Sequence, residues 1–367
     1  MNIQTSIPPT TTPSLREMVR SSLRWALFIL LGGAITSVGS ERMFWFWASD
    51  PRDHWVTSLV YAVPFAAALW AISRFRVGGL SSLLLVAPLF AYVTEGVITP
   101  VMYSGGPFLP VFPAWFTFWH GFIGLVLLWY LLHLWLVRGR WVLISVAAAG
   151  VGLFWGIWST TLWLPENVGD TELLADNGGP LRILGPLAFA RYVLAFTLLL
   201  ALFHWVWGRL RVPSRFDPPR WPRTAYLVAI GGALVMWTLM LPWAAPMFVL
   251  YAGLQILVLR RHERTATGPP LLETLSGPVS AVHLIPLMAI PVTAAGSYWL
   301  LWQVRPADAV LNALMFGVIA VQSVSAALAV SVVAWRTVKA SRGDGQVGGM
   351  AGEAPEADIR RIGTPRP

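Results

Sequence analysis

Long apolar segments recur along nearly the whole chain, and they restrict its fold more than any other feature. A helix needs about 20 apolar residues to cross the hydrocarbon core at 1.5 Å per residue, and about ten segments approach or exceed this length. They lack the alternation of apolar and polar residues that is typical of membrane β-strands. The sequence therefore predicts an all-α fold, a polytopic transmembrane helical bundle with about ten spans. The predicted spans are approximately 23–40, 55–73, 80–102, 114–137, 141–163, 183–207, 224–241, 243–259, 277–301 and 309–335.

The distribution of charge predicts how these spans are oriented. Only 12% of the residues are charged, against about 25% in soluble domains, and the arginines gather in short loops. Cytoplasmic loops are enriched in Lys and Arg, and with ten spans every basic loop falls on one side, which predicts an N-in/C-in orientation. The other side receives the uncharged YSGGPFLPVFP and the acidic PENVGDTELLADNGG. The net charge of +9 is thus a topology signal, and we expect no nucleic-acid partner.

The two ends of the chain depart from the apolar pattern. Residues 1–22 and 336–367 are rich in Pro, Gly, polar or charged residues and are predicted to be disordered cytoplasmic tails around one transmembrane domain, 23–335. Within it, the region 224–259 fits either two short spans or one broken span. Lys339 is the sole lysine, and with abundant Ala and Gly this is typical of a GC-rich bacterium. We expect the bacterial cytoplasmic (inner) membrane as the location.

Three ionisable residues interrupt apolar spans at a similar depth. Glu95 in the third span, His120 in the fourth and Arg191 in the sixth each lie roughly 9 to 12 Å from the external end of their span. A charge inside the bilayer costs at least a few kcal/mol, so such groups normally face inward, have a partner and carry function. These three are the predicted catalytic residues.

Polar and small residues accompany Glu95 and His120. Tyr92, Glu95, Thr99 and Tyr103 have the spacing of one helix face. Thr117, Gly121 and Gly124 lie beside His120, and small residues allow close helix approach or leave room for a ligand. The loop between the two spans is short, which predicts antiparallel neighbours and a direct Glu95–His120 contact. The residues at the end of the first span are predicted to line the mouth of the pocket. The predicted substrate-binding set is therefore Tyr92, Thr99, Tyr103, Thr117, Glu41 and Arg42.

Other readings of the same residues stay open. A Glu, a His and an Arg at one depth also fit a structural ion network that serves no reaction. His133 and His204 lie near the cytoplasmic ends of the fourth and sixth spans, where they fit a bis-histidine haem or amphipathic side chains at the interface. The sequence assigns neither a cofactor nor a metal.

The absence of familiar motifs excludes several classes of enzyme. The chain has no cysteine, which excludes disulfides and a thiolate nucleophile, and no P-loop, H-E-x-x-H or G-x-S-x-G motif. Three functions remain: an enzyme or binder with an externally accessible pocket for a lipid-like or anionic substrate, a proton-coupled transporter of five-plus-five helices, and a non-catalytic assembly protein. The expected partners are membrane lipids and a small-molecule or lipid-like substrate.

Overall fold

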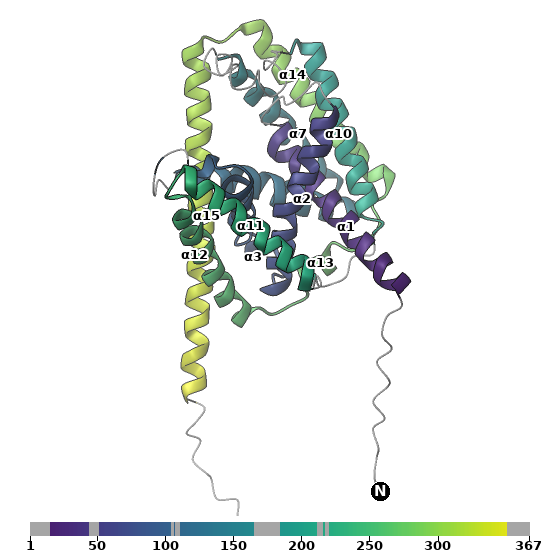
Figure 1. Cartoon of the computed structure of the whole chain (residues 1–367). Coiled ribbons are helices and arrows are strands. Elements are labelled where there is room, and N and C mark those ends of the chain that lie inside the picture. Colours follow the sequence, from purple (N-terminus) through teal and green to yellow (C-terminus); the bar gives the residue numbers. More distant parts are fainter. Residues whose placement is uncertain are drawn as a thin grey trace, which may run out of the picture.

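The described part of the chain is built from helices and short connections and contains no strand. The computed structural model describes residues 15–43, 51–103, 106, 111–164, 184–210, 216 and 220–350. Figure 1 shows α7, α10 and α14 gathered toward one end of the molecule, α11 and α12 toward the other, and the long α15 running along one side. The helices are α1 (Leu15–Ser37), η1 (Val38–Arg42), α2 (Pro51–Arg74), α3 (Leu80–Leu83), α4 (Ala87–Val93), η2 (Thr94–Ile98), η3 (Val101–Tyr103), α5 (Val111–Phe116), η4 (Thr117–Leu131), α6 (Leu132–Val137), α7 (Trp141–Trp158), η5 (Ser159–Trp163), α10 (Pro186–Trp207), α11 (Arg220–Met240), α12 (Ala244–Thr265), α13 (Leu271–Thr274), η6 (Ala281–Met288), α14 (Ala289–Val304) and α15 (Asp308–Met350).

Nine helical stretches among the described residues are long and apolar enough to cross a membrane. They coincide with nine of the ten predicted spans, and the helical fold class is confirmed. The tenth predicted span, 224–241, corresponds to α11, whose apolar part, Tyr226–Met240, is shorter. At 1.5 Å per residue this part reaches about 22 Å, less than the roughly 30 Å of a hydrocarbon core. The region 224–259 forms two helices that meet at Leu241–Trp243.

Several helix boundaries differ from the predicted ones. The third span ends at Ile98 rather than at residue 102, because Pro100 lacks a backbone donor and Thr99 before it is extended, with φ −119° and ψ 145°. Helix α1 already begins at Leu15, and α15 continues to Met350. Helix therefore extends into both predicted tails, and neither helical extension contains a proline. Residues 1–14 and 351–367 lie outside the described residues.

The outer surface of the bundle is apolar, as a lipid environment requires. Large hydrophobic side chains such as Val146 of α7, Leu198 of α10 and Val324 of α15 are all more than half exposed. Contiguous apolar surface of this kind would be a liability in water. The structure is therefore compatible with a multi-pass membrane protein.

Close helix contacts depend on glycines. A Cβ on Gly33 of α1 would lie 2.6 Å from the backbone nitrogen of Ala62 in α2. A Cβ on Gly152 of α7 would lie 2.3 Å from the carbonyl oxygen of Ile290, and Gly156 similarly faces Ala294. Only glycine allows backbones to approach this closely, as is common between membrane helices. These contacts fix α1 against α2 and α7 against the η6–α14 segment.

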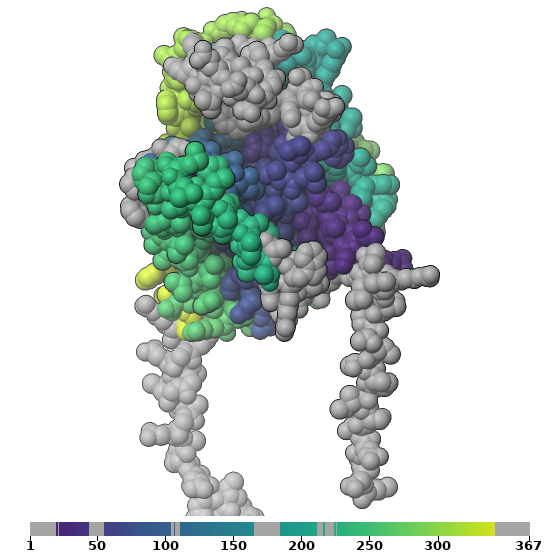
Figure 2. Space-filling model, viewed as in Figure 1, coloured from purple at the N-terminus to yellow at the C-terminus, as the bar shows by residue number. Residues whose placement is uncertain are grey.

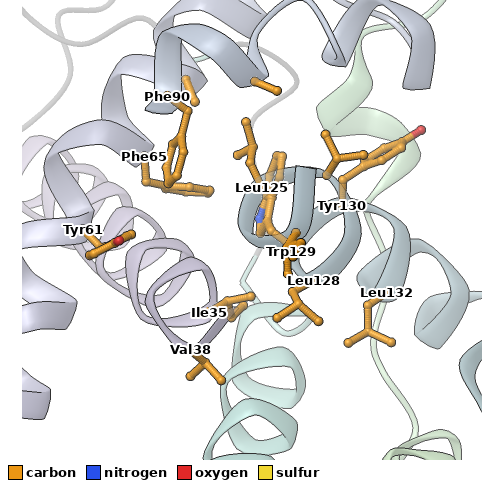
Figure 3. Packing of buried hydrophobic residues seen from close by; sticks show 14 of the residues in the cluster. Ile35, Val38, Tyr61, Phe65, Phe90, Leu125, Leu128, Trp129, Tyr130 and Leu132 are labelled. Atoms are coloured by element: carbon orange, nitrogen blue, oxygen red, sulfur yellow. The ribbon is translucent and has the colours of Figure 1, made fainter. Parts of the chain in front are cut away.

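Aromatic and branched side chains fill the space between α1, α2, α4 and η4. Figure 3 shows Tyr61 and Phe65 of α2 and Phe90 of α4 in this core, with Leu125 and Trp129 of η4 nearby. The rings of Phe65 and Trp129 meet edge to face with centroids 5.0 Å apart.

A second, smaller core joins α11 to the bundle. In it Ile230 and Leu234 of α11 pack on Ala67, Val93 and Val97. Figure 2 shows the green α11 and α12 covering part of this face beside the purple and blue early helices.

Candidate functional site

Three π-helical segments carry Glu41, Glu95 and His120. Glu41 lies in η1, Glu95 in η2 and His120 in η4. A π-helix has i→i+5 hydrogen bonds and is rare, and it is frequently found at functional sites. Each segment continues directly from or into an α-helix, so the change of winding re-aims these side chains within otherwise regular spans.

Glu95 and His120 are in direct contact, as predicted. His120 Nε2 lies 2.7 Å from Glu95 Oε1, and the two side chains are 2% and 10% exposed. The second carboxylate oxygen accepts a hydrogen bond of 2.8 Å from the hydroxyl of Thr99. Both carboxylate oxygens of a buried glutamate are therefore satisfied, which the low polarity of the surroundings requires.

Tyr61 connects this pair to Glu41. Its hydroxyl lies 3.0 Å from His120 Nδ1 and donates a hydrogen bond of 2.6 Å to Glu41 Oε1. Four side chains thus form one chain in the order Glu95, His120, Tyr61, Glu41. Tyr61 was not among the predicted site residues. A tyrosine in an apolar span carries no charge, so the search for buried charges gave no signal for it.

Arg42 is the buried arginine next to this chain. It is 1% exposed, and its guanidinium donates to Thr57 Oγ1 at 2.9 Å. Its carbonyl oxygen accepts a hydrogen bond of 3.2 Å from Tyr192 of α10.

Arg191, by contrast, is exposed on α10. The expectation that Arg191 is buried beside Glu95 is wrong. Adjacent residues of a helix point about 100° apart, so Arg191 and Tyr192 face different sides of α10. The side chain of α10 that reaches Arg42 is that of Tyr192.

The other predicted binding residues lie around the cluster but bond elsewhere. Tyr92 is buried and its ring packs near that of Tyr251, with centroids 5.9 Å apart. The Tyr103 hydroxyl turns back to the carbonyl oxygen of Gly96 at 2.8 Å. Thr117 donates to the carbonyl oxygen of Pro113 at 2.7 Å. The predicted polar stripe is therefore broken after Thr99, where the helix ends.

Aromatic rings and glycines hold His120 in place. The ring of Trp119 is stacked on the imidazole, with an interplanar angle of 7° and centroids 5.4 Å apart, and Trp119 Nε1 donates to the carbonyl oxygen of Ser40. A Cβ on Gly121 would lie 2.7 Å from the carbonyl oxygen of Ala87, and one on Gly124 2.6 Å from Ser40 Oγ. The predicted close helix approach at these glycines is confirmed, and it brings η1 and α4 to η4.

An apolar cavity of about 740 Å³ opens between η4, α7 and α15. Gln322 is the polar side chain in its lining, and it accepts a hydrogen bond of 3.0 Å from Trp115 Nε1. The Trp115 ring packs against that of Trp119 with centroids 5.1 Å apart, and Trp119 in turn covers His120. These two tryptophans therefore lie between the wall of the cavity and the ionisable cluster.

The cluster has the composition of a metal-binding site. One ligand atom each of Glu41, Glu95 and His120 can be chosen so that all three lie within 4.8 Å of one another. Glu41 is partly exposed, whereas Glu95 and His120 are buried. Within the described part of the chain, this is the group of three such side chains whose ligand atoms come this close together.

His133 and His204 form a separate buried pair. Their Nδ1 atoms are 3.1 Å apart and their rings are stacked at 21°. Metal–nitrogen bonds of about 2 Å would hold two axial nitrogens about 4 Å apart on opposite sides of an iron. In this structure the two Nδ1 atoms are closer together than the axial nitrogens of a haem would be.

Comparisons of the chain with protein-family models, curated proteins and solved structures found no match. The function is accordingly inferred from the geometry of the cluster and its surroundings.

Proposed function

We propose that the protein is a bacterial inner-membrane protein with ten spans and both ends in the cytoplasm. The basic loops support this orientation. In Figure 1 the start of α1 and the end of α15 also lie toward the same end of the molecule. The short α11 would be the tenth span or a helix that enters the membrane only in part. Because the chain lacks cysteine, single introduced cysteines labelled from either side of sealed vesicles test the topology; opposite labelling of the two ends would refute it.

Within this membrane domain we propose a membrane-embedded enzyme that acts on a lipid-like or amphipathic substrate. The observation that carries the proposal is the buried Glu95–His120 contact of 2.7 Å, extended through Tyr61 to Glu41. Structural histidines and glutamates can pair in the same way, but this pair shares a hydrogen-bonded chain with a partly exposed carboxylate. A substrate proton therefore has a route into the pair.

The pair is suited to general acid–base chemistry. Glu95 and His120 can accept a proton from water or a substrate hydroxyl and return it to a leaving group, a role that contributes typically 10² to 10⁴ in rate. Tyr61 fixes the imidazole through Nδ1 and can pass the proton on to Glu41. The guanidinium of Arg42 offers positive charge beside the cluster for a developing or bound anion. Arg191, exposed one residue before Tyr192, is proposed to contact an anionic headgroup from the membrane side.

The apolar cavity supports a substrate with a hydrocarbon chain. Met43 lines the cavity and directly follows Arg42, so the lining begins next to the cluster. A fatty chain lying in the cavity would contact Met43 beside Arg42 and Gln322, whose partner Trp115 packs on Trp119. Apolar lining with a few convergent polar groups is the usual composition of a small-molecule site.

Lipid conversion in vesicles tests the enzymatic proposal. Purified protein is reconstituted with a bacterial lipid extract, and the lipids are compared by mass spectrometry before and after incubation. We expect a lipid species to be consumed with the wild type and not with Glu95→Gln or His120→Asn, whereas Glu263→Gln, in an exposed pair with Arg74, serves as a matched control. Identical lipid profiles for wild type and Glu95→Gln would refute an enzyme of this substrate class.

The hydrogen-bonded chain also favours a second function, proton-coupled transport. Glu95, His120, Tyr61 and Glu41 connect η2, η4, α2 and η1, and intramembrane chains of Glu and His act as proton relays in transporters. Proton uptake measured with a trapped pH dye would then depend on Glu95 without any change in lipid composition. If neither lipids nor protons respond, the non-catalytic assembly protein becomes the supported function.

A further inference from the structure

We propose that Glu41, Glu95 and His120 together bind one divalent transition-metal ion such as Zn²⁺ or Mn²⁺. This inference deepens the proposed function and rests on it for its chemical role, because the ion would occupy the proposed catalytic cluster. Two carboxylates and one imidazole are ligands that Zn²⁺, Mn²⁺ and Fe²⁺ all accept in proteins. The three residues come from three different spans, so the ion would also tie η1, η2 and η4 together.

The distances in the cluster are close to those of a metal site. Ligand atoms bound at about 2.1 Å are about 3.0 Å apart at neighbouring octahedral positions and about 3.4 Å apart in a tetrahedron. His120 Nε2 and Glu95 Oε1 are 2.7 Å apart, near the octahedral value. All three ligand atoms lie within 4.8 Å, so an inward turn of the partly exposed Glu41 would complete the set.

The surroundings supply the second shell that metal ligands need. A metal-bound histidine almost always uses its other ring nitrogen in a hydrogen bond that fixes the tautomer and the ring orientation. Tyr61 makes this contact with His120 Nδ1 at 3.0 Å and also holds Glu41. Thr99 holds the second oxygen of Glu95. The parallel ring of Trp119 restricts the imidazole further.

The two carboxylates match the charge of a divalent ion. With a neutral imidazole, Glu41 and Glu95 would balance the ion, which a site of low dielectric requires. Without a metal, the same carboxylates would face Arg42 and a protonated imidazole, so the metal content of the protein decides between the two arrangements.

Metal content of the purified protein tests the proposal directly. The chain carries a tag without histidines, is stripped with a chelator, incubated with excess Zn²⁺ and desalted, and bound zinc is measured by mass spectrometry. We expect about one zinc per wild-type chain and a large loss in Glu41→Gln, Glu95→Gln and His120→Asn, since the full ligand set is needed for tight binding. Glu263→Gln and His283→Asn are the matched controls and should bind as the wild type does.

Tyr61→Phe separates a metal site from an ion network. It keeps all three ligands but removes the second-shell contact, so we expect zinc affinity to fall about 10-fold to 100-fold with the stoichiometry retained. In addition, Mn²⁺ in the wild type should give a paramagnetic resonance spectrum that differs from that of Mn²⁺ in water.

Two results would overturn the proposal. One is a wild-type protein without stoichiometric zinc or manganese, which does not depend on whether the variants fold. The other is zinc that persists in all three ligand variants and is lost in His283→Asn, which would mark surface binding. Lipid conversion by a metal-free wild type that still depends on Glu95 would overturn the metal site and leave the proposed function intact. Zinc bound by the three ligands without lipid conversion would support the metal site and overturn the proposed enzymatic function.

Discussion

Replacing Gly33 by alanine should loosen the contact that places Tyr61 in the cluster. An added Cβ would lie 2.6 Å from the nitrogen of Ala62 and 2.8 Å from the carbonyl carbon of Tyr61. Ordinary contacts begin near 3.4 Å, so α1 and α2 must separate by about 0.6 to 0.8 Å, and overpacking of this kind costs about 1 to 3 kcal/mol. These neighbours are backbone atoms, which cannot rotate away as a side chain can.

A second glycine provides the matched control for this prediction. Gly232 of α11 has open space where a Cβ would be, and alanine is favoured over glycine within a helix by roughly 0.5 to 1 kcal/mol. Gly33→Ala should therefore destabilise the protein and Gly232→Ala should stabilise it slightly. Unfolding by SDS in mixed micelles, followed by circular dichroism, measures both. If Gly33→Ala resists SDS as well as Gly232→Ala does, the backbone contact between α1 and α2 is not as close as described.

The same variant should also affect the site. The hydrogen bond from Tyr61 to Glu41 is 2.6 Å long, and a separation of about 0.6 to 0.8 Å would stretch it to about 3.2 to 3.4 Å, beyond the roughly 3.0 Å of a normal O–H···O hydrogen bond. We expect zinc affinity and lipid conversion to fall in Gly33→Ala and to stay unchanged in Gly232→Ala.

Three further predictions concern the ion pair, the cavity and the histidine pair. Glu95→Gln should lower the rate of the reaction at the cluster by about 10² to 10⁴ while the thermal unfolding temperature changes little; an unfolded variant would instead indicate a structural network. Gly317→Leu should fill the apolar cavity without a clash, since nothing lies near its Cβ position, and should weaken lipid retention measured by mass spectrometry, whereas Gly296→Leu, equally open and outside the lining, should not. His133→Leu should lower the free energy of unfolding by about 1 to 3 kcal/mol, because it leaves Nδ1 of His204 without its partner. The double variant His133→Leu/His204→Leu removes both polar groups and should therefore unfold at a higher temperature than His133→Leu alone.

The sequence predicted the features that depend on the length of an apolar segment and on the depth of a residue within its span. Apolar length located nine helices, and depth together with a short loop brought Glu95 to His120. Depth says nothing about direction around the helix axis, which is why Arg191 was expected where Tyr192 lies. The buried arginine beside the cluster is Arg42, which the sequence analysis placed at the mouth of the pocket.

Tyr61 could not be found by the same reasoning. A tyrosine in an apolar span carries no charge and therefore does not stand out as an expensive residue. Its role depends on the α1–α2 contact at Gly33, which is a tertiary feature. Likewise, local propensity does not distinguish a π-helical turn from an α-helical one, so the windings of η1, η2 and η4 were not predicted.

These windings have a consequence for how the chain can change over evolutionary time. A π-turn can arise from an α-helix by insertion of a single residue, and removal of one residue can restore the tighter winding. In an α-helix one residue corresponds to about 100° of rotation. A one-codon deletion between Thr94 and Ile98 would leave a hydrophobic helix that still spans the membrane, yet Glu95 or everything after it would turn away from His120. Apolar substitutions that fit the packing preserve this geometry, whereas a change in the number of residues in these three segments does not.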